Sequence, residues 1–229
     1  MYSKNTHDFN IIVHEMSKDV LKDFNSDRFR VVIFGSARVQ PDNQIYQDIR
    51  KLAKKIGQAG HDIVTGGGPG IMEAANLGHR EGTPQANNPA RSIGLNIRLP
   101  MEQQENHNLD IMQIHDRFST RLDEFMALSN IVIIAPAGGI GTLLEFFYTW
   151  QLLQVHHIRK MPIVLIGDMW KGLIEWIRKE PLIYRYLDPE DMNFIIHVDN
   201  CEEAFAIIEK THQKFMENKK ISCQIVKKL

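Results

Sequence analysis

The sequence predicts an α/β fold built on a doubly wound, mostly parallel sheet with helices on both faces. Short apolar segments alternate along the chain with segments in which apolar residues recur at helical spacing. Residues 131–135 are apolar throughout, as expected of a strand that is covered on both faces. Glycine-rich turns join a strand to the following helix within 64–76 and 133–151. Together these features are typical of Rossmann-like folds.

Each expected strand is a short apolar run bounded by glycine, proline or polar residues. We expect strands at 30–36, 61–67, 91–99, 109–115, 131–135, 161–167 and 194–198. Except after 91–99, where a polar loop follows at 100–108, each strand is followed by a segment with the apolar spacing of a helix. We expect helices at 43–59, 69–81, 117–129, 142–156, 169–180 and 201–215. Gly60 suits the end of the first of these helices, and Pro69 suits the start of the second.

The two ends of the chain are expected to differ from this core. Apolar residues recur at helical spacing near the N-terminus, at Phe9, Ile12, Val13, Met16, Val20 and Phe24. We therefore expect residues 1–27 to form a helical extension, with a helix over 8–24 that packs on the main body or on a partner subunit. Residues 218–229 are expected to form a loose tail. No repeat or linker divides the chain, so residues 1–229 are expected to be one domain.

Composition narrows the class of function. The 229 residues carry a formal net charge of −1 and are 43% hydrophobic, which suffices for a core and lacks the basic excess of nucleic-acid-binding proteins. Cys201 and Cys223 form no CxxC pair and no zinc spacing, which fits free thiols in a reducing compartment. There is no signal-peptide pattern and no apolar run near the ~20 residues that cross a bilayer. We expect a cytoplasmic protein without nucleic-acid or membrane partners.

The two glycine-rich turns predict a site for a phosphorylated ligand. Each turn opens a helix, whose first backbone N–H groups have no partner within the helix and can hold a phosphate. A glutamate follows each turn, Glu145 in one case and Glu73 in the other. Neither GxGxxG nor GxxxxGK[ST] is present, which disfavours NAD and P-loop nucleotide sites. The alternatives are close helix–strand packing at the glycines and a capping box formed by Thr142 and Glu145.

Ligands of such sheets bind at the carboxyl ends of the strands. The expected ends are 35–38, 66–70, 98–108, 115–121 and 138–142, and the 98–108 loop is expected to shape the pocket for the base. Three arginines fall at these ends and are candidates for phosphate or base contacts: Arg38, Arg117 and Arg121. The ten histidines show no metal-ligand pattern, and His115 is the candidate at a strand end. We expect no metal site.

These residues resemble the LONELY GUY (LOG) family, whose members are often labelled lysine decarboxylases. Its GGGxxGxM-type turn reads GGGPGIME at 66–73, and its PGGxGTxxE signature reads PAGGIGTLLE at 136–145. FGSAR at 34–38 also matches, and RLDEFMALSNIVIIAP, from residue 121, is similar to bacterial purine/pyrimidine nucleotide 5′-monophosphate nucleosidases of the same superfamily. The resemblance covers about residues 30–200.

The resemblance implies cleavage of the N-glycosidic bond of nucleoside 5′-monophosphates, such as AMP or cytokinin nucleotides, to free base and ribose 5-phosphate. It implies a catalytic pair, Arg121 and Glu145, a homodimer or larger homo-oligomer, and no cofactor. Nothing resembles a pyridoxal-phosphate lysine motif, so lysine decarboxylation is not expected. The other residues expected to bind the substrate or its phosphate are Gly35, Ser36, Arg38, Gly67, Gly68, Glu73, Arg117, Gly138, Gly139, Gly141 and Thr142.

The expected mechanism places Glu145 beside a ribosyl cation-like transition state, where it also activates water. Arg121 would orient the nucleotide, and Glu73 would bind ribose hydroxyls. One departure from the family pattern is Ala137, inserted between the proline and the glycines, which either forms a bulge or displaces the phosphate site. A non-catalytic nucleotide sensor or carrier, and a sugar-phosphate transferase, remain alternative functions.

Overall fold

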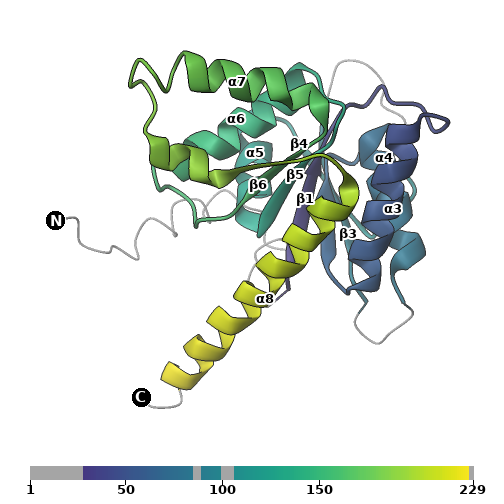
Figure 1. The fold of residues 1–229 in the computed structure, drawn as a ribbon. Coiled ribbons are helices and arrows are strands. Elements are labelled where there is room, and N and C mark those ends of the chain that lie inside the picture. Colours follow the sequence, from purple (N-terminus) through teal and green to yellow (C-terminus); the bar gives the residue numbers. More distant parts are fainter. Residues whose placement is uncertain (1–27, 85–88, 99–105, 227–229) are drawn as a thin grey trace.

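The computed structural model describes residues 28–84, 89–98 and 106–226, with side chains to residue 219. Seven parallel strands form one sheet in the order β4-β3-β2-β1-β5-β6-β7 (Figure 1). Their bounds are β1 Arg30–Phe34, β2 Asp62–Thr65, β3 Ser92–Ile97, β4 Ile111–His115, β5 Ile131–Ile134, β6 Ile163–Ile166 and β7 Ile195–Val198. The predicted α/β class and all seven predicted strands are confirmed. The helix expected over 8–24 and most of the 98–108 loop lie outside the described residues.

The order of the strands creates a switch point between β1 and β5. From β1 the chain adds β2, β3 and β4 in one direction, and β5 then pairs with the other side of β1. Val31 pairs with Ile131 and Phe34 with Ile134, so the two strands end side by side. The loops that leave β1 and β5 turn to opposite faces of the sheet, which opens a crevice between them.

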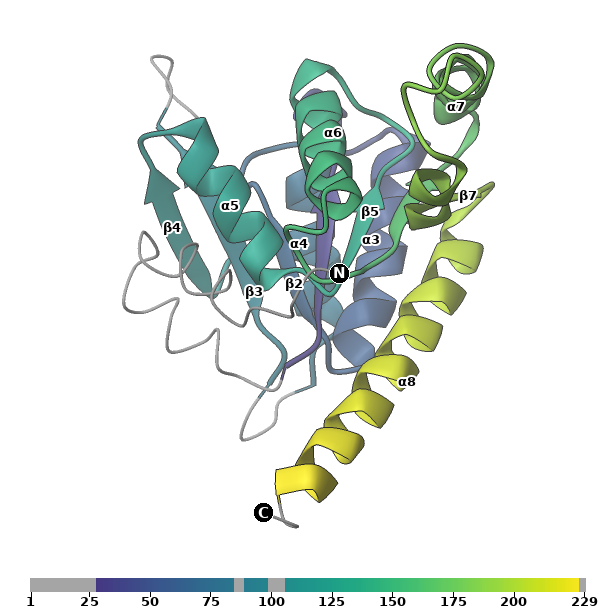
Figure 2. The ribbon, with the colours of Figure 1, turned by 90° about the vertical axis from the view of Figure 1, so that its left-hand side faces the viewer.

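Helices cover both faces of the sheet because alternate residues of the central strands point to opposite sides (Figures 1 and 2). Val31 and Ile33 pack with α3, α4 and α8, whereas Val32 and Phe34 pack with α5, α6 and α7. The helices are α3 Gln44–Gln58, α4 Ile71–Gly82, α5 Phe118–Leu128, α6 Ile140–Gln154, α7 Lys171–Lys179 and α8 Cys201–Val226. In the described part of the chain, none of the helices combines the length and apolar composition needed to span a membrane.

Three features differ from the predicted helices. Helix α6 begins at Ile140, earlier than predicted, because Gly139 already serves as its N-cap residue in an extended conformation. Helix α8 continues to Val226, so the prediction of a loose tail from residue 218 is wrong over 218–226; no glycine or proline follows Cys201 to end the helix. A short 3₁₀ helix, Pro189–Phe194, was not predicted and is fixed by a capping box of Asp188 and Asp191.

Helices α3 and α4 pack closely through two glycines of α4. A Cβ atom at Gly78 would overlap the carbonyl oxygen of Arg50, and one at Gly82 would overlap that of Lys54. We expect Gly78→Ala to lower the free energy of unfolding by at least about 2 kcal/mol, because backbone must move to admit the methyl group. Urea denaturation measures this loss. Gly172→Ala in α7 is the matched control, since its Cβ meets open space and should leave stability unchanged or slightly raised.

Candidate functional site

A cavity of about 750 Å³ lies at the switch point, a volume typical of small-molecule sites. Its walls are the loops that follow β1, β2 and β5, the end of β3, and the first turns of α5 and α6. Of the predicted site residues, those that line the cavity are Gly35, Ser36, Arg38, Gly68, Arg121, Gly138, Gly139, Gly141, Thr142 and Glu145. Residues from distant parts of the sequence therefore meet at one edge of the sheet.

Ala137 is held within the loop that follows β5. Its carbonyl oxygen accepts a hydrogen bond of 2.8 Å from the backbone N–H of Ser36, in the loop that follows β1. Two residues earlier, the Ala135 N–H donates to the Phe34 carbonyl at 2.9 Å. The Ala135 carbonyl accepts from the indole of Trp170 at 3.0 Å. The additional residue thus continues the pairing of β1 with β5 beyond the strands, and the glycines after it remain at the cavity.

The start of α6 is open to the cavity. Gly139 is the N-cap residue, and no side chain caps the helix there. A Cβ atom at Gly139 or Gly141 would meet nothing within 4 Å, so space remains above the first amides of the helix. Because these N–H groups have no acceptor within the helix, they are available to an anion. Thr142 is the third residue of α6 and is buried, so the capping-box alternative does not apply.

Arg121 and Glu145 face each other in the cavity. Their closest atoms, Nη1 and Oε1, are 3.7 Å apart, and the side chains are only 10% and 12% exposed. Nε of Arg121 donates to the Leu95 carbonyl at 2.7 Å, and the guanidinium lies 5.1 Å from the ring centre of Phe125. The arginine is therefore fixed on one side by the end of β3 and on the other by its own helix.

Burial changes the acidity of Glu145. Loss of solvation raises the pKa of its carboxyl group from 4.5 to about 7, although the positive charge of Arg121 acts in the opposite direction. Loss of solvation also lowers the pKa of Arg121, which the charge of Glu145 partly offsets. A carboxyl group with a pKa of about 7 can exchange a proton at neutral pH, which is the property required of a catalytic acid or base.

The first glycine-rich turn serves this pair in a way that the sequence did not predict. A Cβ atom at Gly66 would overlap Nη2 of Arg121, so a side chain there would displace the guanidinium from its present position. Met72, Asn96, Ile97, Phe118 and Met169 also line the cavity without having been predicted. The signal for Gly66 was its place directly after a strand, and for Asn96 and Ile97 their place at a strand's carboxyl end.

The start of α4 is closed, unlike that of α6. Gly70, its N-cap residue, has a φ of 67°, and the Ile71 N–H donates to the Ser36 carbonyl at 3.0 Å. A Cβ atom at Gly70 would lie 2.5 Å from that same oxygen. The loop after β1 therefore occupies the position that a phosphate would need, and the two turns are not equivalent.

Three predicted site residues do not line the cavity. Gly67 has a φ of 69° and donates its N–H to the Thr65 hydroxyl at 3.0 Å, so it shapes the turn. Glu73 lies on the side of α3, where its charge is the second cause, after burial, of the raised pKa of Tyr46. Arg117 is exposed at the N-cap of α5.

His115 is also outside the cavity. Its Nε2 lies 2.9 Å from a carboxylate oxygen of Glu124, and both side chains are buried. Its Nδ1 lies 3.3 Å from the Thr120 hydroxyl. These contacts join the end of β4 to α5. Within the described ranges, no group of three His, Cys, Asp or Glu side chains is arranged to hold a metal ion.

Comparison with known proteins finds a matching family model and a related sequence. A family model described as "Possible lysine decarboxylase" matches residues 63–208. The chain is also similar to the pyrimidine/purine nucleotide 5′-monophosphate nucleosidase of Escherichia coli K12, with 25% identity over 197 residues. That match covers 83% of this chain and 42% of the nucleosidase, so the chain spans less than half the length of the curated relatives it matches.

Solved structures show a shared fold. The molybdenum cofactor carrier protein of Chlamydomonas reinhardtii superposes with a TM-score of 0.60 and 18% identity, covering 81% of this chain and 99% of that one. The molybdenum cofactor binding protein of Rippkaea orientalis gives a TM-score of 0.59 and 18% identity, covering 80% of this chain and 96% of that one. At this identity the likeness concerns the arrangement of strands and helices alone.

Proposed function

Since the chain belongs to the family described as possible lysine decarboxylase, we propose that it shares the hydrolytic chemistry of that family's nucleosidase relatives. The reaction is cleavage of the N-glycosidic bond of nucleoside 5′-monophosphates to free base and ribose 5-phosphate. The observation that carries the proposal is the Arg121–Glu145 pair, buried beside the open start of α6. No lysine is found among the described residues that line the cavity, so the cavity does not support amine chemistry through a lysine Schiff base.

The 5′-phosphate would bind at the start of α6. The amides from Gly139 to Thr142 and the positive end of the helix dipole favour a dianion there. Glu145 lies in the next turn of the same helix, so a phosphate held at the helix start brings the attached ribose toward this carboxylate. Binding energy from the phosphate, which does not react, thereby positions the anomeric carbon.

The carboxylate of Glu145 would act on the glycosidic bond. As the bond between C1′ and the base nitrogen breaks, positive charge develops on the ribose, and a nearby carboxylate stabilises it. The same carboxylate accepts a proton from the water that attacks C1′. The charge of Arg121 favours the ionised form of Glu145, and Arg121 orients the nucleotide. The base departs with the bonding electron pair and takes up the proton, which returns Glu145 to its ionised form.

This role predicts a pH dependence. Because Glu145 acts ionised and its pKa is about 7, kcat should rise with pH through about 7 and reach a plateau above it. Arg121→Gln should move this rise to higher pH, since the charge of Arg121 lowers the pKa of Glu145. Steady-state rates between pH 5 and 9 measure both. A kcat that falls as the pH rises through 7 would show that Glu145 acts as an acid instead.

A non-catalytic carrier or sensor is the second candidate. The solved structures that share the fold include proteins described as molybdenum cofactor carriers, so the fold alone does not separate the two functions. The buried carboxyl group, whose pKa is about 7, favours the hydrolase, because binding alone does not require such a group in the cavity.

Incubation with a panel of nucleoside 5′-monophosphates tests the proposal. Chromatography should detect free base and ribose 5-phosphate in equal amounts. A rise in melting temperature with AMP, without release of base, would support the carrier instead. Release of base that requires a second substrate would indicate a transferase.

We also propose that copies of the chain associate through the outward face of α6 (Figure 2). Ile140, Leu144 and Phe147 recur at helical spacing and are 83%, 43% and 40% exposed, an apolar surface beside the cavity. Leu144→Glu should therefore shift the protein toward the monomer in light scattering, whereas a monomeric wild type would contradict the proposal.

A further inference from the structure

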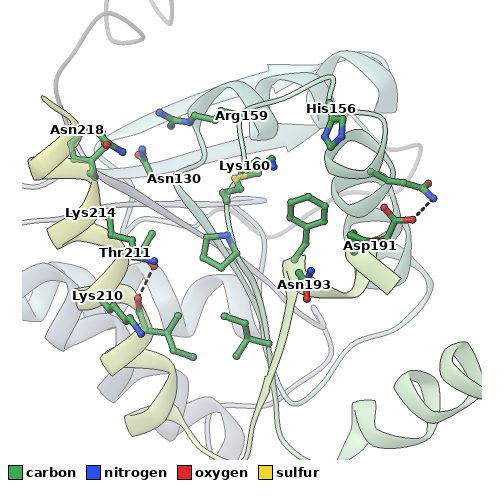
Figure 3. A pocket seen from close by; sticks show the side chains of 18 of the residues that line it. Asn130, His156, Arg159, Lys160, Asp191, Asn193, Lys210, Thr211, Lys214 and Asn218 are labelled. Atoms are coloured by element: carbon green, nitrogen blue, oxygen red, sulfur yellow. Dashed lines mark hydrogen bonds between the residues drawn. The ribbon is translucent and has the colours of Figure 1, made fainter. Parts of the chain in front are cut away.

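A second, larger cavity lies at the opposite edge of the sheet (Figure 3). It measures about 1090 Å³ and is formed between α8, the segment that leads into β6, and the segment before β7. Phe29, Asn130 and Pro162 line it, and each directly precedes or nearly precedes a strand, so the cavity is at the amino ends of the strands. It is therefore separate from the candidate active site. We call it the basal groove.

The basal groove has an apolar floor. The apolar residues that line it are Phe29, Met161, Pro162, Phe194, Ile196, Ile207 and Phe215. The rings of Phe29 and Phe215 are 5.6 Å apart in an edge-to-face arrangement, which joins the start of the described chain to α8. Most of these side chains are only partly buried, as expected of a surface that packs against something further.

Four cations surround this floor. Lys210 and Lys214 lie one turn apart on α8, and Figure 3 shows Arg159 and Lys160 on the facing wall. None of the four forms an ion pair with another residue in the ranges 28–84, 89–98 and 106–219. Two of the three acidic residues on the third wall have other partners: Asp191 accepts from Gln154 at 2.9 Å, and Asp188 forms a capping box with Asp191. Glu190 also lines this wall.

The sequence before Arg28 has the complementary pattern. Its apolar residues, already described, would form one stripe of a helix over 8–24. Glu15, Asp19 and Asp23 recur every four residues and would form a row along one side of that stripe. Lysines on α8 recur with the same spacing, at 210 and 214. The segment also joins the described chain beside Phe29, at the groove itself.

We propose that the basal groove is the docking site for residues 8–24 of the same chain. The apolar stripe covers the floor of the groove, and the acidic row pairs with the lysines of α8. Docking removes apolar surface from water and neutralises cations that converge on one cavity. It also fixes α8 against the sheet, because the segment contacts both.

A charge exchange in the chain of 229 residues tests the proposal. Glu15→Lys with Asp19→Lys, and separately Lys210→Glu with Lys214→Glu, should each lower the melting temperature by about 2–4 °C in low salt. The combination of all four changes should recover most of the loss, since opposite charges again face each other. Lys18→Glu with Lys22→Glu, outside the acidic row, is the control and should leave the midpoint unchanged.

Hydrogen exchange gives a direct readout. Amides of residues 9–24 should be protected in the wild type and should lose protection in the Lys210→Glu, Lys214→Glu variant. Three results would overturn the proposal: no recovery in the four-fold variant, stabilisation by inorganic phosphate that depends on Lys210 and Lys214 but not on Glu15 and Asp19, or loss of a dimer in the Glu15→Lys, Asp19→Lys variant. The second result would identify a small-anion site, and the third a segment supplied by another copy.

Discussion

Replacing Glu145 by glutamine is expected to lower kcat on AMP by about 10²–10⁴-fold, the usual effect of removing a catalytic acid–base group. Glutamine has nearly the same shape, so the cavity and the position of Arg121 should be preserved. What is lost is the negative charge that stabilises the developing ribosyl cation, together with the acceptor for the proton of the attacking water. Release of adenine from AMP at pH 8, followed by chromatography, measures the loss.

The same substitution should stabilise the fold at high pH. A carboxyl group whose pKa is about 7 in the folded protein, above its value of 4.5, binds its proton more tightly when folded. The stability that comes from this tighter proton binding is therefore fully present below pH 4.5 and is lost as the pH rises toward 7. At ~1.4 kcal/mol per pH unit, the loss approaches about 3 kcal/mol. Glu145→Gln avoids it, so the variant should unfold at a higher temperature than the wild type at pH 8 but not at pH 4.

Glu73→Gln is the matched control for this experiment. Glu73 occupies the equivalent place after the other glycine-rich turn but lies on the side of α3, away from the cavity. We expect this variant to retain the rate of the wild type. Full activity in Glu145→Gln together with a large loss in Glu73→Gln would reverse the assignment of the catalytic carboxylate.

AMP is expected to be hydrolysed with a kcat/KM about 10³-fold higher than that of adenosine, because only AMP carries the group that binds at the start of α6. The amides of the open helix start, rather than contacts to the base, would hold the substrate in register with Glu145. Parallel assays on the two substrates measure the ratio. Similar rates for AMP and adenosine would exclude the phosphate as the anchor.

Gly141→Asp tests the location of this anchor. The aspartate would place a carboxylate where the phosphate binds, so activity on AMP should fall strongly while the small activity on adenosine stays as it was. Gly141→Ala is the control, since a Cβ atom there meets nothing within 4 Å and the protein should fold normally. An equal loss on both substrates in Gly141→Asp would indicate a general disturbance of the cavity.

Much of this arrangement follows from local sequence. Short apolar runs such as 131–135 favour central strands covered on both faces. The helical segments between such runs allow neighbouring strands to be parallel, because each helix connects the end of one strand to the start of the next. The glycines before α6 mark a strand that passes directly into a helix, whatever the rest of the chain does. Arg121 and Glu145 could also be named in advance, because each belongs to a motif that is continuous in sequence.

Other features depend on contacts between distant segments. The sequence gives α4 and α6 the same start, a glycine-rich turn followed by a glutamate, but the helices pack on opposite faces of the sheet. The loop after β1 closes the start of α4 through the Ser36 carbonyl and leaves that of α6 open. Likewise, Gly66 has its role only because Arg121, 55 positions later, reaches it from another helix.

The sequence by itself therefore determined the elements, their order and the residues capable of the chemistry, because apolar spacing and turn residues act over a few positions. Only the tertiary structure decided which glutamate faces the cavity, which helix start can take an anion, and how far burial raises the pKa of Glu145. Burial and proximity are properties of the packed sheet and helices, and they arise from pairs of residues that are far apart in the chain.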